Sequence, residues 1–278
     1  MLVPAAMRGS ITPLPRVRSS SNNAPSLLPP RLVDALRSAN SLAIISGAGL
    51  SAPAPSSVPT YRGPHGLYTR NENYSALLSG EVLAKHPRAT WHVLGKMAAH
   101  LFAAECQPNA AHRALADLEA VVDATRGQSR FRFVHLTQNV DGLLARAGCS
   151  SHLELHGSLR RVFCLSLGCA FEGPLTEGMV ATAVAGEHVP ACPRCGKGEL
   201  RPDVVLFGEP LPSMVVDEWE RQLYTPSVAD VLVAVGTSGV FPYIQEPLAL
   251  CNRAGKLSVV VDVAETMLSY MVCVGGAS

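Results

Sequence analysis

Apolar residues follow two alternating patterns along the chain. Short continuous apolar runs, of the length expected for buried strands, lie at residues 42–45, 131–136, 230–235 and 257–261. Segments with apolar side chains at helical spacing lie at residues 32–36, 110–122 and 244–253. Strands that are apolar on both faces and alternate with helices are typical of a parallel sheet with helices packed on both sides. The pattern therefore predicts an α/β fold built on a doubly wound parallel sheet.

Two insertions interrupt this alternation. Residues 64–106 are helical in character, whereas residues 159–202 form short, glycine-rich segments that contain closely spaced cysteines. We expect the insertions to form a second, smaller lobe, while the larger lobe is assembled from residues 30–63, 107–158 and 203–278. A chain of 278 residues is long enough to bury the core that this arrangement needs.

The N-terminal segment, residues 1–29, has a composition that cannot bury a core. The first 33 residues contain arginine but neither aspartate nor glutamate, and serine, asparagine and proline are frequent. We predict either a flexible tail or a mitochondrial transit peptide here, although the prolines at positions 4, 13 and 15 oppose the amphipathic helix that a transit peptide needs. A mitochondrial location is therefore an expectation, with the cytoplasm or the nucleus as the alternative.

Composition excludes several classes of protein. Hydrophobic residues make up 47% and charged residues 16%, so the chain is globular rather than disordered. Its 23 basic and 22 acidic residues give a formal net charge of +1, which predicts no intrinsic affinity for nucleic acid. Prolines and glycines interrupt the apolar runs before any reaches the roughly 18 residues that a membrane span needs. We expect a soluble protein with no membrane partner.

Four of the eight cysteines form two close pairs. Four residues separate Cys164 from Cys169, and two separate Cys192 from Cys195. Such spacing favours a reducing compartment and a tetrahedral Zn²⁺ site over disulfide bonds. Because four thiolates leave no coordination position for a substrate, the metal is predicted to be structural, holding together a loop-rich lobe too small to have a core of its own. The other cysteines are predicted to be small buried apolar residues.

Polar residues gather where predicted strands end. Ser46-Gly-Ala-Gly49 follows the first strand, Thr137-Gln-Asn-Val-Asp-Gly142 the second and Gly236-Thr-Ser238 a third. In open α/β sheets this edge binds ligands, and a glycine-rich turn lets backbone N–H groups approach a pyrophosphate. The alternatives are a plain tight turn for the glycines and a helix N-cap for Asn139 or Asp141. The third glycine of the usual dinucleotide fingerprint is absent, which disfavours an ordinary dehydrogenase.

A histidine stands at the end of another element, where His156 precedes Gly157. A lone histidine is more often structural than catalytic. Imidazole can nevertheless accept a proton near neutral pH, so His156 is also a candidate general base. These motifs are more informative in their order along one chain than any of them is alone.

This combination of motifs resembles the sirtuins, NAD-dependent protein lysine deacylases. The resemblance covers roughly residues 31–270 and is carried by Gly47-Ala-Gly-Leu-Ser51, Val58-Pro-Thr-Tyr-Arg-Gly63, Thr137-Gln-Asn-Val-Asp141, His156-Gly157, the four paired cysteines, Phe207-Gly-Glu209 and Gly236-Thr-Ser238. Three segments, residues 58–66, 108–113 and 200–203, look most like the class that includes the mitochondrial desuccinylase-type sirtuins.

The resemblance implies a Rossmann-like large lobe, a smaller helical and zinc-binding lobe, and NAD bound between them as a co-substrate. In the family's reaction the acyl oxygen of a modified lysine attacks the ribose carbon as nicotinamide departs, and the acyl group ends on ADP-ribose. Two alternatives would use the same cleft. One is an NAD- or ADP-ribose-binding regulatory protein with little turnover, and the other is a protein mono-ADP-ribosyltransferase.

The resemblance also implies roles for individual residues. His156 matches the base that deprotonates a ribose hydroxyl, and Asn139 and Asp141 match the pair at the nicotinamide and ribose end. The residues expected to bind the cofactor are Gly47, Ala48, Gly49, Ser51, Tyr61, Arg62, Gln138, Asn139, Asp141, Gly236, Thr237, Ser238 and Asp262. The strand that contains Val204, Val205 and Phe207 is expected to receive an acylated-lysine protein substrate by backbone pairing.

The chain departs from the family pattern in ways that bear on NAD affinity. Residues 52–57 make a loop about two residues longer than the family's, with two prolines and without its usual acidic residue and glycine. Tyr61 stands in place of a phenylalanine, Asp262 in place of an asparagine, and the sequence stops short of the family's last adenine-contacting segment. A stiffer loop with fewer N–H donors is expected to hold the cofactor less tightly.

The acyl preference is predicted from the helix of the smaller lobe. Desuccinylase-type sirtuins pair the acyl carboxylate with a tyrosine and an arginine three residues apart. When the helix is anchored on Trp91, Leu94 and Met97 occupy those positions. Because burying an unpaired carboxylate costs several kcal/mol, we expect a preference for acetyl or other neutral acyl groups. A slip of one residue in the anchoring would present Lys96 or His92 instead.

Overall fold

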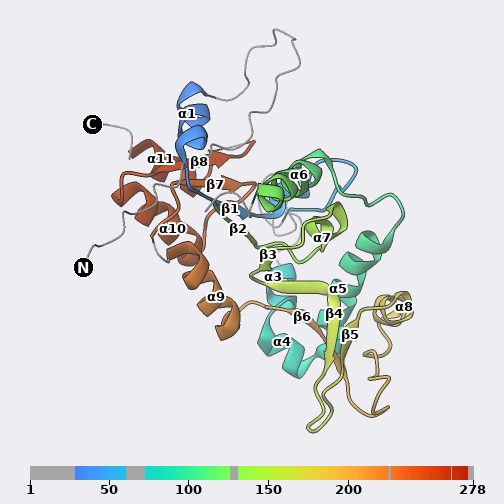
Figure 1. The fold of residues 1–278 in the computed structure, drawn as a ribbon. Helices are drawn as coiled ribbons and strands as arrows, with labels where there is room; N and C mark the ends of the chain where they lie inside the picture. The colour runs from blue at the N-terminus through green and yellow to red at the C-terminus, as the bar shows by residue number, and fades with distance from the viewer. Residues whose placement is uncertain (1–28, 61–72, 126–130, 225–226, 264, 275–278) are drawn as a thin grey trace, which may run out of the picture.

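A five-stranded parallel sheet lies at the centre of the protein (Figure 1). The structure is a computed structural model, and it describes residues 29–60, 73–125, 131–224, 227–263 and 265–274. In spatial order the strands are β3 (His152–Glu154), β2 (Arg132–Thr137), β1 (Ser41–Ser46), β7 (Val231–Val235) and β8 (Leu257–Val261). The four apolar runs of the sequence all became strands of this sheet, which confirms the predicted α/β class. The fifth strand, β3, is short and only half-buried, and its sequence gave no apolar run.

Strand β1 is the central strand, and all six of its residues are buried. It pairs in parallel with β2 and with β7, so that Ser46 stands beside both Thr137 and Val235. The carboxyl ends of these three strands therefore meet at one edge of the sheet. The polar segments that follow them in the sequence are brought together at that edge.

Helices cover both faces of the parallel sheet. Ala43 and Ile45 of β1 point into a core shared with α9 (Ser213–Tyr224), α10 (Pro242–Arg253) and α11 (Met267–Val274). Leu42 and Ile44 point the other way, into a core closed by α1 (Pro30–Ser38) and α6 (Ala110–Thr125). Successive side chains of a strand face opposite sides, so one apolar run supplies both cores. The doubly wound arrangement is confirmed.

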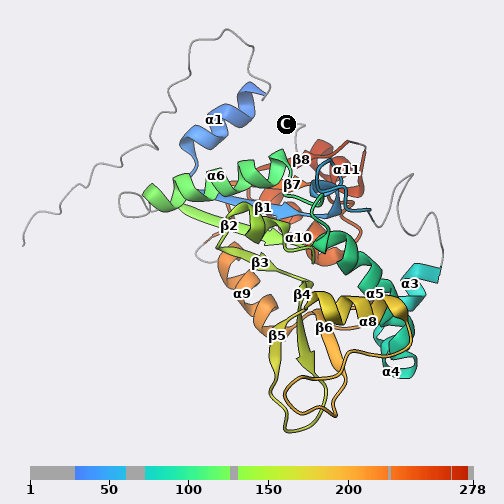
Figure 2. The same cartoon turned by 90° about the vertical axis from the view of Figure 1, so that its right-hand side faces the viewer.

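A second group of elements lies beside this sheet (Figure 2). It contains an antiparallel sheet with strand order β5-β4-β6, made of β4 (Gly157–Cys164), β5 (Glu172–Pro174) and β6 (Leu200–Val204). Its helices are α3 (Asn73–Leu77), α4 (Gly80–Lys85), α5 (Pro87–Phe102) and α8 (Glu177–Ala185). Helices α5 and α8 pack closely on each other, and Gly95 of α5 lets them approach, because a Cβ there would lie 2.7 Å from the Cβ of Ala183.

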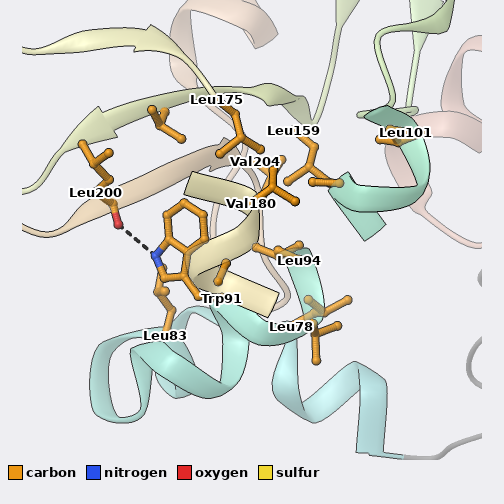
Figure 3. Close-up of a cluster of buried hydrophobic side chains, with 14 of the residues drawn as sticks. Leu78, Leu83, Trp91, Leu94, Leu101, Leu159, Leu175, Val180, Leu200 and Val204 are labelled. Carbon is orange, nitrogen blue, oxygen red and sulfur yellow. Dashed lines mark hydrogen bonds between the residues drawn. The ribbon is translucent and has the colours of Figure 1, made fainter. Parts of the chain in front are cut away.

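The expectation that this smaller lobe lacks a core of its own is wrong. Trp91 is 1% exposed and lies in a cluster of buried side chains from α5, α8 and the antiparallel sheet (Figure 3). Its indole N–H donates to the carbonyl of Leu200 over 2.9 Å, which satisfies the one polar atom of the ring. The apolar face of α5, which includes Trp91, Leu94 and Leu101, needs a partner surface to make this core. The core forms because the two insertions, far apart in the sequence, pack on each other.

Several predictions concern residues outside the described ranges. The proposed tail or transit peptide lies almost entirely there, and so do Tyr61 and Arg62 of the expected cofactor loop. Among the helices that the structure describes, none combines the length and the apolar character needed to cross a membrane.

Candidate active site

Two glycine-containing loops interlock at the carboxyl edge of the parallel sheet. The N–H of Gly47 donates to the carbonyl of Val235 over 3.0 Å, and the N–H of Gly49 donates to the carbonyl of Gly236 over 2.8 Å. A Cβ on Gly49 would lie 2.7 Å from the Cα of Gly236, so a larger residue does not fit. The expectation that these N–H groups face a pyrophosphate is not met at Gly47 and Gly49, because carbonyls of the neighbouring loop accept from both. The role of the loop in cofactor binding stays a prediction.

The side chain of Gln138 joins the same two loops. Its amide nitrogen donates to the hydroxyl of Thr237 over 2.8 Å, and its backbone N–H donates to the carbonyl of Ser46 over 2.9 Å. Thr237 is buried by this contact, whereas Ser238 is exposed. Asp262, at the end of β8, is also exposed. Of the predicted contacts to the adenosine half of the cofactor, Ser238 and Asp262 are therefore the accessible side chains.

A buried polar network centres on Ser51, which follows the short helix η1 (Ala48–Leu50). Its hydroxyl oxygen lies 2.7 Å from Oδ2 of Asp141 and 3.1 Å from both Nδ2 of Asn139 and Nε2 of His112. This hydroxyl thus connects the loop after β1, the loop after β2 and helix α6. Since Ser51 is enclosed by these partners, it would act on a bound cofactor through Asn139 and Asp141 rather than by direct contact.

Hydrogen bonds on both ring nitrogens orient the imidazole of His112. The carboxylate of Asp141 can only accept, so the Ser51 hydroxyl donates its proton there. The Ser51 oxygen then accepts from the Nε2–H of His112, while Nδ1 of His112 lies 2.9 Å from Oδ1 and 3.2 Å from the backbone nitrogen of Asn109. Burial lowers the pKa of His112, and the nearby Asp141 carboxylate opposes this shift. The network ties Asp141 and Asn139 to helix α6 through Ser51.

Asp141 also begins a helix. Its Oδ1 accepts from the backbone N–H of Leu143 over 2.8 Å, at the start of α7 (Leu143–Ala147). The N-cap residue itself is Gly142 in a left-handed conformation. One oxygen of this carboxylate thus accepts from the first turn of α7, while the other accepts from Ser51 at the candidate site. Asn139 is half-buried, and its Nδ2 also donates to the carbonyl of Gly47 over 3.1 Å.

His156 lies between β3 and β4, where its ring faces the loop after β2. Its Nδ1 is 2.9 Å from the carbonyl oxygen of Gln138, and its Nε2 is 2.8 Å from the hydroxyl of Tyr243. Since a carbonyl can only accept, Nδ1 carries the proton and Nε2 carries the lone pair. Burial lowers the pKa of His156, partly opposed by the Gln138 carbonyl, so the ring is neutral at pH 7. A neutral imidazole with a fixed tautomer has the properties of a general base.

The segment after β6 runs beside His156. The N–H of Val205 donates to the carbonyl of His156 over 2.9 Å, and Val204 ends the buried strand before it. Phe207 pairs with the turn before α4, donating to Leu78 over 2.9 Å and accepting from Gly80 over 3.0 Å. A substrate strand would have to pair with the other backbone groups of this segment. Peptide binding here stays a prediction.

The two residues expected in the acyl pocket both lie on α5. Leu94 is 3% exposed and belongs to the core around Trp91, while Met97 is half-buried and packs against that core. The side chains of Leu94 and Met97 are thus both surrounded by apolar residues. The acyl preference drawn from Leu94 and Met97 stays a prediction.

The four paired cysteines converge on one point. The sulfurs of Cys164 and Cys195 are 3.8 Å apart, those of Cys169 and Cys192 are 3.7 Å apart, and all four lie within 4.8 Å of one another. A tetrahedral Zn²⁺ with sulfur ligands at about 2.3 Å requires S···S separations of about 3.8 Å. Backbone N–H groups of Ser166 and Gly198 donate to two of these sulfurs, as expected for thiolates. The residues fit a structural zinc ion.

Comparison with known proteins agrees with this geometry. The model of the Sir2 family matches residues 47–242, which include the glycine loops, the Ser51 network, His156 and all four cysteines. The chain belongs to the Sir2 family. It is 38% identical over 247 residues to the NAD-dependent protein deacylase 2 of Pseudomonas aeruginosa, an alignment that covers 87% of this chain and 88% of the relative.

Solved Sir2 structures resemble the whole arrangement. A Sir2 homologue in complex with NAD superposes with a TM-score of 0.71 at 32% identity, over 88% of this chain and 86% of that one. A Sir2 structure with a deacetylated p53 peptide and 3'-O-acetyl-ADP-ribose superposes with a TM-score of 0.72 at 26% identity, over 87% of this chain and 89% of that one. These likenesses confirm the Sir2 fold and leave the subclass open.

Three residues of this Sir2 site were not predicted from the sequence. His112 and Asn109 lie in the segment 108–113, which gave only a resemblance to a subclass. Asn109 also accepts at Oδ1 from the backbone N–H of Ala111, at the start of α6. An asparagine at this position is typical of an ordinary helix N-cap and does not by itself indicate a functional site. Tyr243 stands in the first turn of α10, where an aromatic residue suggests core packing and not contact with a base.

Proposed function

We propose that this Sir2-family chain removes acyl groups from protein lysines with NAD as co-substrate, giving nicotinamide and O-acyl-ADP-ribose. The observation that carries the proposal is the fixed tautomer of His156, whose proton-accepting nitrogen lies at the sheet edge formed by the two glycine loops. The names of the relatives and the NAD and acetyl-ADP-ribose complexes of the solved structures support the same reaction.

The chain's own residues would divide the work as follows. NAD would supply the ribose carbon that accepts the acyl oxygen, with nicotinamide as the leaving group. Nε2 of His156 would take the proton of a ribose hydroxyl, and the Gln138 carbonyl would hold the ring in the required tautomer. Asn139, oriented by Ser51 and by the Gly47 carbonyl, would present its amide to the nicotinamide and ribose end. Ser238 and Asp262 would contact the adenosine half.

Zinc would take no part in the chemistry. Four cysteine ligands complete a tetrahedral sphere, so no position is left for water or substrate. The ion would hold the end of β4 against the turn before β6, at the border of the core around Trp91. The smaller lobe would thus combine a metal clamp with a hydrophobic core.

One assay separates this function from the two alternatives. The protein is incubated with NAD and an acetyl-lysine peptide, and the products are identified by mass spectrometry. Nicotinamide together with O-acetyl-ADP-ribose supports deacylation. ADP-ribose attached to protein, without deacylated peptide, would indicate mono-ADP-ribosyl transfer. NAD binding without nicotinamide release would indicate a regulatory module.

Acyl preference and compartment are finer parts of the proposal. The apolar side chains of Leu94 and Met97 favour neutral acyl groups, although parts of the sequence look most like the desuccinylase-type class. A mitochondrial location would follow if the arginine-containing, acid-free segment before residue 34 acts as a transit peptide. Fusion of residues 1–33 to a fluorescent protein tests directly whether this segment directs the protein to mitochondria.

A further inference from the structure

The proton-accepting atom of His156 is occupied by a hydroxyl from the same chain. Nδ1 donates to the Gln138 carbonyl, so Nε2 holds the only lone pair in the plane of the ring. The hydroxyl of Tyr243 lies 2.8 Å from Nε2 and must therefore be the donor. An imidazole nitrogen accepts one hydrogen bond. A ribose hydroxyl can reach Nε2 only when the Tyr243 hydroxyl has left it.

Aromatic packing holds Tyr243 at this position. Its ring is stacked on Phe241, with centroids 5.1 Å apart and planes inclined by 5°, and it meets the edge of Trp219 at 6.0 Å. The ring of His156 stands edge-on to both Phe241 and Tyr243. Trp219 is 4% exposed, so the packing rests on the core beneath α9 and α10. Aromatic neighbours therefore orient both rings for the hydrogen bond between Tyr243 and His156.

We propose that Tyr243 is a positioning residue that restrains the base: its hydroxyl holds the His156 imidazole through Nε2 until the co-substrate displaces it. This inference rests on the proposed deacylase function. The hydrogen bond exists before proton transfer and is absent during it, so it stabilises the ground state without stabilising the transition state. Because the bond is present in the free protein and is lost when the co-substrate binds, the restraint lowers kcat/KM for NAD.

The contact also weakens the base. A donor to Nε2 favours neutral imidazole over imidazolium, because the lone pair that would take the proton is already engaged. Among the described neighbours of the ring, Tyr243 is the titratable one, and burial raises its own pKa to about 12. Gln138, Phe241 and the backbone of Val205 carry no charge. Removal of the hydroxyl should therefore raise the pKa of His156.

The test is Tyr243→Phe, which keeps the ring and its packing and removes only the hydroxyl. We expect kcat/KM for NAD, measured with an acetyl-lysine peptide, to rise about two- to tenfold, the factor set by one net hydrogen bond. The acid limb of the kcat/KM profile, which reports the free protein, should move to higher pH. Tyr224→Phe is the matched control, because it removes a hydroxyl from another half-buried tyrosine that packs against the same core and does not contact His156. That variant should leave kcat/KM and the acid limb of its pH profile unchanged.

A second readout does not depend on turnover. In the cofactor-free protein, the ring-proton NMR signal of His156, assigned by its loss in His156→Ala, is titrated with pH. The pKa should rise in Tyr243→Phe and stay constant in Tyr224→Phe. An unchanged or lowered pKa, or a kcat/KM equal to or below that of the wild type, would overturn the inference. A wild-type protein that releases no nicotinamide would refute the deacylase function, while the NMR titration would still decide the role of Tyr243.

Discussion

The hydroxyl oxygen of Ser51 lies 2.7 Å from a carboxylate oxygen of Asp141, although 90 positions separate the two residues in the sequence. This contact closes a network in which Ser51 donates once and accepts twice. It ties the loop after β1 to the loop after β2, the two segments between which the nicotinamide end of the cofactor is expected. A single buried hydroxyl thus sets the relative position of Asn139 and Asp141.

Ser51→Ala should lower both stability and NAD affinity. The change leaves the Nε2–H of His112 and Oδ2 of Asp141 buried without their partner, at a cost of about 1–3 kcal/mol in the free energy of unfolding. Denaturant unfolding and calorimetric titration with NAD measure the two effects. Ser46→Ala is the control, because it removes another buried serine–histidine hydrogen bond and leaves the Ser51 network intact. Equal NAD affinity in both variants would contradict the assigned role of Ser51.

His156→Ala should nearly abolish turnover, with a loss on the order of 10² to 10⁴ in rate, as expected when a positioned general base is removed. NAD binding and the thermal transition should change little, since the ring is only half-buried and touches no charged group. Single-turnover nicotinamide release measures the first effect and calorimetry the second. A variant that keeps most of the wild-type rate would remove His156 from the mechanism.

Stability should fall with pH below about 6.5 because of His135. This residue of β2 is fully buried beside the Ser46 hydroxyl, and burial lowers its pKa to about 3 from an ordinary value of 6.5. The unfolded chain therefore binds the proton first. The stability that neutral His135 contributes is complete above the unfolded pKa and is lost as the pH falls from there towards 3.

This one histidine adds at most about 1.4 kcal/mol per pH unit to the slope of the unfolding free energy. His112 adds a contribution of the same sign, because burial lowers its pKa as well. Denaturant unfolding between pH 4 and 7 measures the slope. In His135→Gln the side chain no longer titrates, so the slope should become shallower. An identical slope in both proteins would show that His135 is not the responsible group.

Removal of zinc should loosen the cysteine-containing end of the smaller lobe without melting all of it. Two of the ligands, Cys164 and Cys192, belong to the core around Trp91, and Cys169 and Cys195 pack against it, but most of that core is formed by apolar side chains that bind no metal. Cys192→Ser should lose the metal, lower the Tm and abolish activity. Cys149→Ser, at a buried cysteine outside the cluster, should keep a full zinc content. A metal-free protein with unchanged Tm and activity would refute the zinc site.

Neutral acyl groups should be the better substrates. Acetyl, butyryl and succinyl versions of one peptide are compared by kcat/KM, with succinyl expected to be the poorest because Leu94 and Met97 offer its carboxylate no partner. Met97→Arg is the informative variant, since a guanidinium at this position could pair with the carboxylate. The highest kcat/KM for succinyl in the wild type would overturn the expectation.

The strands of the fold were predictable because each is a continuous apolar run. Leu42–Ile45 and Leu257–Val261 lie within the observed β1 and β8, whose bounds differ from these by no more than one residue. The candidate site was predictable where chemistry follows a strand end, as at Gln138 and Asn139.

What could not be predicted depends on contacts between distant segments. The core around Trp91 needs two insertions to meet, and the sequence of α5 does not show which segment covers its apolar face. The glycines at 47 and 49 suggested space for a phosphate, whereas they make room for the loop at Gly236. Tyr243 looked like a packing residue, and its hydroxyl reaches a base 87 positions away. These contacts join residues that come together only when the whole chain has folded.

The position of β1 at the middle of the parallel sheet has a consequence for synthesis of the protein. One neighbour, β7, lies almost 190 positions later, as the bond between Ser41 and Asp230 shows over a separation of 189. A nascent chain on the ribosome therefore carries β1, a strand that is fully buried in the folded protein, long before this second neighbour emerges. Contacts of such high contact order form slowly, and exposed strand edges invite aggregation. We expect folding to be largely post-translational and dependent on chaperones, with the cofactor edge completed last, when residues 236–243 arrive.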